Sequence, residues 1–146
     1  MRIDSGTVVR LAGKEVRKMQ QHAESEYPFE ACGLLGGVAD NGTVDVTEVW
    51  LLRNTDRSEE HFSLDPEEQL AAILDMRAKG LSPVGNWHSH PHTPSRPSRE
   101  DIRLAYDPNA VYMILSLESR AAPNLNAFSV RNGQADWLVL ECYDEE

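Results

Sequence analysis

The sequence predicts a mixed α/β fold, with one curved β-sheet flanked by two longer helices and one short helix. Two segments carry apolar residues at helical spacing, and several short apolar runs bounded by turn residues are typical of strands. Asn41-Gly42 and Asn132-Gly133 are typical of hairpin turns between such strands. With 146 residues, the chain is expected to form one domain, 1–146, with its own core. It is too short for a TIM barrel, which needs about 250 residues.

The first half of the chain predicts three strands and one helix. Val16, Met19 and Ala23 recur at helical spacing, and Tyr27-Pro28 ends that helix. A compact apolar run with three glycines follows, and it favours a buried strand. The expected elements are a short strand over Thr7–Leu11, a helix from Gly13 to about Ala23, a buried strand over Phe29–Val38 and a strand over Thr43–Leu52.

The second half begins with a well-capped helix. Asp65 is its expected N-cap, Pro66 its first residue and Glu68 its third, and Gly80 is the expected residue just past its end. Its residues at helical spacing are Leu70, Ile73, Leu74 and Arg77. The further expected elements are a strand over Pro83–His90, a short helix from Ser98 to about Tyr106, and strands over Ala110–Leu117, Asn126–Arg131 and Ala135–Glu141.

The composition excludes several classes of partner. Asp and Glu number 24 against 14 Lys and Arg, a net charge of −10, so no nucleic-acid partner is expected. The N-terminus lacks a signal-peptide core and no apolar run reaches about 18 residues, so we expect no membrane partner and a cytoplasmic location. Residues from about 143 to 146 are expected to form a solvated acidic tail. Cys32 and Cys142 lack the spacing of a zinc ribbon or redox pair and are expected to be buried thiols.

The segment from His88 to Asp101 has the features of a metal site. His88 and His90 end a predicted strand and, being two residues apart, point to the same face. A loop with three prolines then leads to Ser98, the expected N-cap of the short helix, and to Asp101 in its first turn. Two imidazoles and one carboxylate make a three-ligand site, in which zinc keeps its fourth position for water. Ser98 and Asp101 also have the spacing of a capping motif, so capping alone remains an alternative for this pair.

The pattern His88-x-His90-Pro91, six residues, then Ser98-x-x-Asp101 resembles the complete JAMM signature of the MPN+ metallopeptidases. The segment Tyr27–Gly36 is similar to the strand with which these enzymes bring in a catalytic glutamate, and the likeness extends over nearly the whole chain. The resemblance implies an MPN (JAB-like) fold and one zinc ion per chain with a bound water. The residues it implies are the metal ligands His88, His90 and Asp101 and the catalytic residues Glu30 and Ser98.

The chemistry of amide hydrolysis requires such parts. A carboxylate near the metal takes a proton from water and hands it to the leaving amine. Glu30 is the only acidic residue in the apolar run Phe29–Val38, although a glutamate at an exposed strand end remains an alternative. The resemblance implies that Glu30 holds the zinc water and that the Ser98 hydroxyl donates to the oxyanion. The remaining histidines, His22, His61 and His92, are expected to be surface, packing or loop residues, with His92 near the substrate.

The resemblance is to the compact, stand-alone prokaryotic (Mec-type) group. It implies a small ubiquitin-like or sulfur-carrier partner with a C-terminal Gly-Gly, cleaved at the following bond, with release of cysteine as one proposed reaction. An isopeptidase that removes such a modifier from lysine is the alternative within the enzyme class. A non-catalytic MPN scaffold is an alternative from another class, disfavoured because every metal ligand is present. A cupin-like metal binder requires a glutamate where this chain has Pro94 and Ser95.

Overall fold

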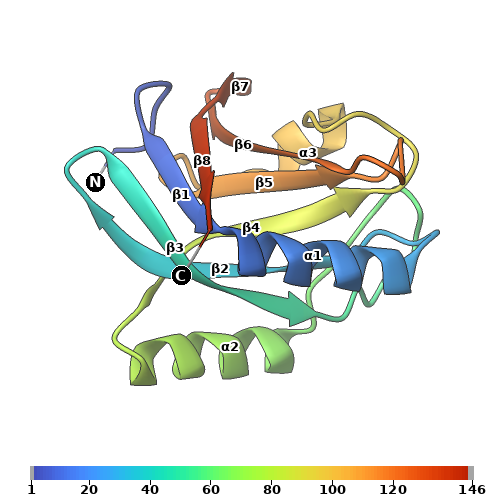
Figure 1. The fold of residues 1–146 in the computed structure, drawn as a ribbon, viewed down its shortest axis with the longest axis horizontal. Coiled ribbons are helices and arrows are strands. Elements are labelled where there is room, and N and C mark those ends of the chain that lie inside the picture. The colour runs from blue at the N-terminus through green and yellow to red at the C-terminus, as the bar shows by residue number, and fades with distance from the viewer. Residues whose placement is uncertain (1, 145–146) are drawn as a thin grey trace.

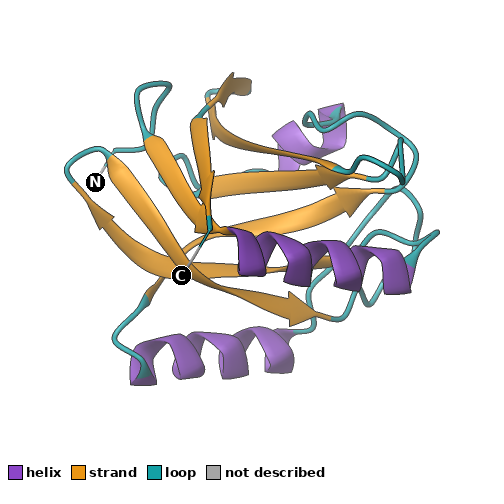
Figure 2. Ribbon diagram, viewed as in Figure 1, coloured by secondary structure: helices purple, strands orange, loops and turns teal. Residues whose placement is uncertain are grey.

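The computed structural model describes residues 2–144, in which helices are interspersed among strands along the chain (Figure 1; Figure 2). The elements are β1 (Val8–Ala12), α1 (Gly13–Glu26), β2 (Cys32–Asp40), β3 (Thr43–Leu52), α2 (Pro66–Ala78), β4 (Ser82–His90), α3 (Arg99–Leu104), β5 (Val111–Ser116), β6 (Asn124–Arg131), β7 (Gln134–Trp137) and β8 (Val139–Tyr143).

One mixed sheet contains the strands, in the order β7-β6-β5-β4-β2-β3-β1-β8. Strand β1 pairs in parallel with β3 and β8, and β4 pairs in parallel with β5. The other neighbours are antiparallel. The predicted mixed α/β fold is therefore confirmed, with two longer helices and one short helix packed around a single sheet.

The sheet is curved enough to bring its two edges together. Strand β7 forms one edge and β8 the other, yet only Leu138 separates them in the chain. The Leu138 N–H donates to the Ala127 carbonyl, and the Val139 N–H donates to the Thr7 carbonyl. The prediction of one last strand over Ala135–Glu141 is therefore wrong, because the chain leaves one edge at Leu138 and joins the other.

The element boundaries follow from local chemistry. The Asp65 carboxylate accepts a hydrogen bond from the Glu67 N–H at the start of α2, as expected of an N-cap. Gly80, just past the end of this helix, has a φ of 73°, which a residue with a Cβ adopts only with strain. Asn41 and Asn132 also have positive φ, in the two hairpin turns that the sequence predicted.

The two long helices cover opposite faces of the sheet. Adjacent leucines on β2 show this, because Leu35 packs in the larger core cluster with α1, and Leu34 packs with Met76 of α2. Figure 1 shows α1 crossing in front of the strands and α2 running along the β2–β3 side. Trp87 lies fully buried in the α1 cluster. His88 pairs with Cys32 in register and therefore shares the face of Leu34.

The apolar face predicted for α2 is wrong in detail. Its buried residues are Ala72 and Met76, whereas Leu70 and Leu74 are 58% and 52% exposed. Ile73 is half-buried and packs against the smaller core cluster. Both sides of this helix carry apolar residues, so helical spacing alone does not show which side meets the sheet.

Both cysteines are free, but only one is buried as predicted. Cys32 is fully buried in β2, and burial raises the pKa of its thiol to about 12. Cys142 is exposed on the edge strand β8, so its predicted burial is wrong.

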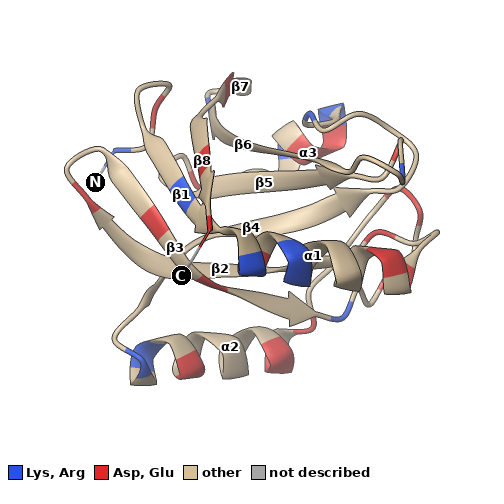
Figure 3. Cartoon of the chain, in the orientation of Figure 1, with Lys and Arg blue, Asp and Glu red and all other residues tan. Residues whose placement is uncertain are grey.

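Charged side chains of both signs occur on α1 and on α2 (Figure 3). Within residues 2–144, no helix is long and apolar enough to span a membrane. Tyr143, near the start of the expected acidic tail, is paired in β8. Asp144 is exposed, and residues 145 and 146 lie outside the described part of the chain.

Candidate metal centre

His88 and His90 end strand β4 side by side, as the spacing predicted. The strand runs antiparallel to β2 and parallel to β5, so the backbone around both residues is held on two sides. Both side chains are buried, and their Nε2 atoms lie 3.1 Å apart. The ring of Phe62 stacks on His88 with centroids 4.6 Å apart, which fixes the orientation of this imidazole.

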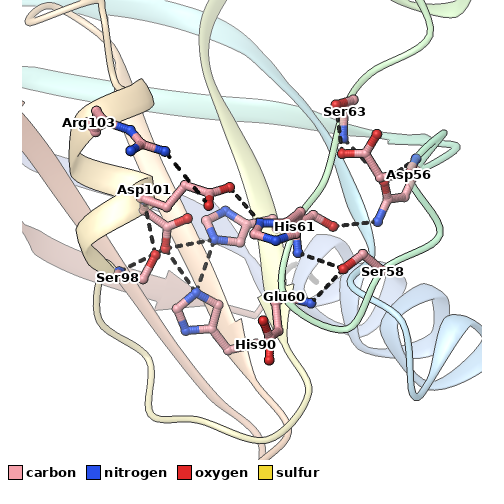
Figure 4. A network of polar contacts seen from close by, with 12 residues as sticks. Asp56, Ser58, Glu60, His61, Ser63, His90, Ser98, Asp101 and Arg103 are labelled. Atoms are coloured by element: carbon pink, nitrogen blue, oxygen red, sulfur yellow. Dashed lines mark hydrogen bonds and ion pairs between the residues drawn. The ribbon is translucent and has the colours of Figure 1, made fainter.

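Asp101 reaches the two imidazoles from α3. Its Oδ2 atom lies 3.2 Å from Nε2 of His88 and 3.0 Å from Nε2 of His90 (Figure 4). Burial by itself would raise the pKa of the Asp101 carboxyl, but the two histidines and the Ser98 N–H together bring that pKa below its ordinary value. The carboxylate is therefore stabilised in the charged form that binds cations.

The donor set fits a tetrahedral metal ion. The three ligand atoms form a triangle with sides of 3.0, 3.1 and 3.2 Å. Ligands at about 2.0–2.1 Å from a tetrahedral zinc ion would lie roughly 3.3 Å apart, close to this triangle. The tautomer of His90 fits as well, since its Nδ1 lies 2.9 Å from the Pro94 carbonyl and donates to it. Its Nε2 then offers a lone pair toward Asp101, and a cation between the two would stabilise this approach.

Glu30 lies beside this triad although it precedes the strand in which it was predicted. Strand β2 begins at Cys32, which pairs with His88, so continuing the antiparallel register places Glu30 level with His90. The Glu30 N–H donates to the Ser58 carbonyl, and the Asn54 amide donates to the Glu30 carbonyl. The backbone of Glu30 is therefore fixed from the β3–α2 loop.

The Glu30 carboxyl is buried rather than exposed at a strand end. Its side chain is 3% exposed, and Oε1 has no hydrogen-bond partner among the described residues. Burial, followed by the charge of Asp101, raises the pKa of this carboxyl to about 9. A buried acid beside three potential metal ligands is the arrangement that proton transfer in a metal-assisted hydrolysis requires.

Ser98 and Asp101 form a reciprocal capping box at the start of α3. The Asp101 N–H donates to Ser98 Oγ at 3.0 Å, and the Ser98 N–H donates to Asp101 Oδ2 at 2.9 Å. The capping interpretation of this pair is therefore confirmed. Capping does not exclude a role of Asp101 in metal binding, since its Oδ2 atom also contacts both histidines. The Ser98 hydroxyl accepts the capping hydrogen bond and still has its own proton to donate.

The other histidines lie outside the ligand triad. His92 is exposed in the loop after β4, with Nε2 2.8 Å from Glu59, and His22 packs edge-on against Trp87. His61 is exposed on the β3–α2 loop, and its Nδ1 lies 2.6 Å from Oε1 of Glu100 on α3. Figure 4 shows His61 on a different loop from the helix start that carries Ser98 and Asp101.

Two residues of the β3–α2 loop organise the site in ways that sequence reasoning missed. Asn54 is 5% exposed, and its amide donates both to the Glu30 carbonyl and to the His61 carbonyl at 2.9 Å. The His61–Glu100 contact joins residues 39 positions apart. No spacing pattern marks a contact of that separation, and Asn54 begins a segment whose polarity predicts an exposed loop.

Two hollows flank the triad. The larger, about 450 Å³, is lined by His88 and Asp101 and by apolar side chains that include Phe62, Leu104 and Ile114. The smaller, about 390 Å³, is lined by Glu30, His90 and Ser98 together with charged side chains. The residues that line both are Glu60, His61 and Glu100. The three ligand residues are thus flanked by one hollow with apolar side chains and one with charged side chains.

Comparisons with known proteins find one matching family and several named relatives. Residues 14–131 match a family described as prokaryotic homologues of the JAB domain. A CysO-cysteine peptidase from Mycobacterium tuberculosis is 33% identical over 135 residues, which cover 91% of this chain and 91% of that protein. A desampylase from Haloferax volcanii is 33% identical over 102 residues, which cover 69% of this chain and 72% of that protein.

A solved structure extends the likeness to the fold. The solution structure of protein DSY2949 from Desulfitobacterium hafniense is similar with a TM-score of 0.87 and 44% identity. The match covers 94% of this chain and 94% of that one. The family match over residues 14–131 includes the strand and the helix that carry the ligand triad.

Proposed function

The chain belongs to the prokaryotic homologues of the JAB domain, and from this membership we propose that it is a zinc-dependent hydrolase of the JAMM type. Its substrate is a small ubiquitin-like or sulfur-carrier protein, cleaved at the amide bond that follows a C-terminal Gly-Gly. The observation that carries the proposal is the meeting of His88, His90 and Asp101 beside the buried carboxyl of Glu30.

Each residue has a role that its environment supports. His88, His90 and Asp101 hold one zinc ion. Zinc supplies Lewis-acid chemistry, since it polarises a carbonyl oxygen and lowers the pKa of water to about 7. Glu30 accepts a proton from water and passes it to the leaving amine. Ser98 donates its hydroxyl hydrogen to the oxygen on which negative charge develops.

The relatives support a peptidase that acts on a ubiquitin-like substrate. The CysO-cysteine peptidase matches nearly end to end, and its name describes a peptidase that acts on CysO-cysteine. We therefore take a carrier ending in Gly-Gly-Cys as the first candidate substrate. Its tail would lie in the larger, apolar hollow beside His88 and Asp101.

A second candidate is an isopeptidase that removes a ubiquitin-like modifier from lysine. The desampylase match favours it, at the same identity over a shorter part of the chain. A non-catalytic scaffold is disfavoured, because the three ligand atoms meet within hydrogen-bonding distance and the acid beside them is buried.

The proposal is tested by offering both bonds to the purified protein. One substrate is a ubiquitin-like carrier that ends in Gly-Gly-Cys, and the other is the same carrier joined through Gly-Gly to a lysine side chain. We expect hydrolysis of the first, its loss on adding a chelator, and its recovery on restoring zinc. Cleavage of the isopeptide alone would select the second candidate, and chelator-insensitive cleavage would overturn the zinc mechanism.

A further inference from the structure

The position of Glu30 distinguishes the two sides of the candidate site. The group that protonates a leaving amine must come within hydrogen-bond reach of its nitrogen. Glu30 lines the smaller hollow and not the larger one. Under the proposed function, the leaving group therefore occupies the smaller hollow, and the carrier tail occupies the larger.

Most charged groups of the smaller hollow already have partners. The Glu59 carboxylate lies 2.8 Å from His92, and the Glu100 carboxylate lies 2.6 Å from His61. Arg99, also in the lining, is exposed and has no ion pair within residues 2–144. Its guanidinium is therefore free to bind an anion that enters this hollow.

We propose that Arg99 binds the α-carboxylate of the leaving group, so that the enzyme releases a single C-terminal amino acid. This inference rests on the proposed function and names the class of bond that is cut. A guanidinium forms paired, charge-assisted hydrogen bonds with a carboxylate, a geometry that no other cation in the lining offers. A lysine attached through its side chain presents no carboxylate near the broken bond, so it does not gain this interaction.

The hydrolysis that follows is balanced without a further reactant. Water adds its oxygen to the carbonyl carbon of the terminal glycine, and the bond from that carbon to the amine nitrogen breaks. One proton of the water passes through Glu30 to the nitrogen, so the products are a carrier ending in Gly-Gly and a free amino acid. Glu60, a further carboxylate in this lining, suits the ammonium group that this amino acid acquires in water.

The chain offers a matched control in Arg96. This arginine is also exposed, lies three residues earlier in the loop that leads into α3, and forms no ion pair among the described residues, but it does not line the smaller hollow. Replacing either arginine by alanine removes one positive charge from the same surface. Only the change at Arg99 should affect recognition of the carboxylate.

The test uses two carrier substrates, one ending in Gly-Gly-Cys with a free carboxylate and one with that carboxylate converted to an amide. We expect the wild-type protein and Arg96→Ala to favour the free acid by roughly 10–100-fold in kcat/KM, the range for a hydrogen bond to a charged group. Arg99→Ala should lose this preference through a higher KM for the acid, with cleavage of the amide unchanged. Arg99→Lys should retain part of it, and zinc content should be the same in all four proteins.

Equal cleavage of acid and amide by the wild-type protein would overturn the role of Arg99. So would a preference that survives in Arg99→Ala, or one that Arg96→Ala loses equally. These failures are distinct from failure of the proposed function, which would show as no chelator-sensitive cleavage of either substrate.

Discussion

Asp101 serves two purposes that the residue pattern alone could not separate. Its Oδ2 atom accepts the Ser98 N–H in a capping box and also lies 3.0 Å from His90. A residue with both contacts affects stability and metal binding together. Ser98, which forms the other half of the capping box, allows the two effects to be measured apart.

Replacing Asp101 and Ser98 in turn separates capping from metal binding. Ser98→Ala and Asp101→Ala should each lower the unfolding free energy by about 1 kcal/mol, since each removes one side of the cap. Only Asp101→Ala should lose zinc, as measured by elemental analysis after dialysis, and Ser98→Ala should keep zinc while kcat falls roughly 10²–10³-fold. An Asp101→Ala protein that binds zinc as well as the wild type would reduce this carboxylate to a helix cap.

Glu30→Gln tests proton transfer with little change in shape. The variant should fold and bind zinc as the wild type does, while kcat falls roughly 10²–10⁴-fold because the amide cannot carry a proton. Steady-state kinetics measure the fall in kcat, and zinc analysis shows whether metal binding is unchanged. Turnover at the wild-type rate would remove Glu30 from the mechanism.

The burial of Glu30 also makes the metal-free protein sensitive to pH. Burial raises the pKa of this carboxyl from 4.5 to about 9, so between these values the folded protein binds a proton that the unfolded chain does not. The unfolding free energy should therefore fall as pH rises through this window. Glu30→Gln lacks the titration, so its stability relative to the wild type should increase between about pH 5 and about pH 8. Urea unfolding in a chelator measures this, and a constant difference would contradict it.

At the residue scale, the sequence pattern predicted which side chains form the ligand triad more successfully than it predicted which residues surround the triad. His88, His90 and Asp101 were predicted because strand alternation and a helix start place them on one side. The sequence did not indicate Arg99, because an arginine without an ion pair is recognised only when the three-dimensional contacts of its neighbours are known.

At the scale of single elements, α2 shows where periodicity is insufficient. The helix has apolar residues on both sides, and the sheet buries the smaller Ala72 with Met76 rather than Leu70 with Leu74. The caps at both ends were predictable because they depend on local chemistry. The rotation of a helix depends on the partner that it packs against.

Paired substitutions on α2 test this orientation. Met76→Ala should lower the unfolding free energy by about 2–5 kcal/mol, because it empties a fully buried site. Leu74→Ala, about half of whose side chain is exposed, should change it by roughly 0.5 kcal/mol or less. Urea denaturation gives both values, and a larger loss for Leu74→Ala would mean that the helix packs on its other side.

At the scale of the whole molecule, the sheet assembles the site from distant parts of the chain. The segment just before β2 delivers Glu30, the neighbouring strand β4 delivers the two histidines, and α3 closes the triad with Asp101. The mixed sheet could be predicted from the strand patterns. Its closure at Leu138 could not, because it depends on hydrogen bonds from Leu138 to Ala127 of β6 and from Val139 to Thr7 before β1.

The central claim is that two imidazoles and one carboxylate hold a metal ion. X-ray absorption spectroscopy at the zinc edge of the reconstituted protein tests it most directly. We predict one zinc ion per chain with two imidazole ligands, oxygen in the remaining positions and no sulfur. The absence of sulfur is informative, because Cys32 pairs with His88 on the neighbouring strand. A zinc–sulfur distance of about 2.3 Å, or a spectrum without imidazole scattering, would contradict the site described here.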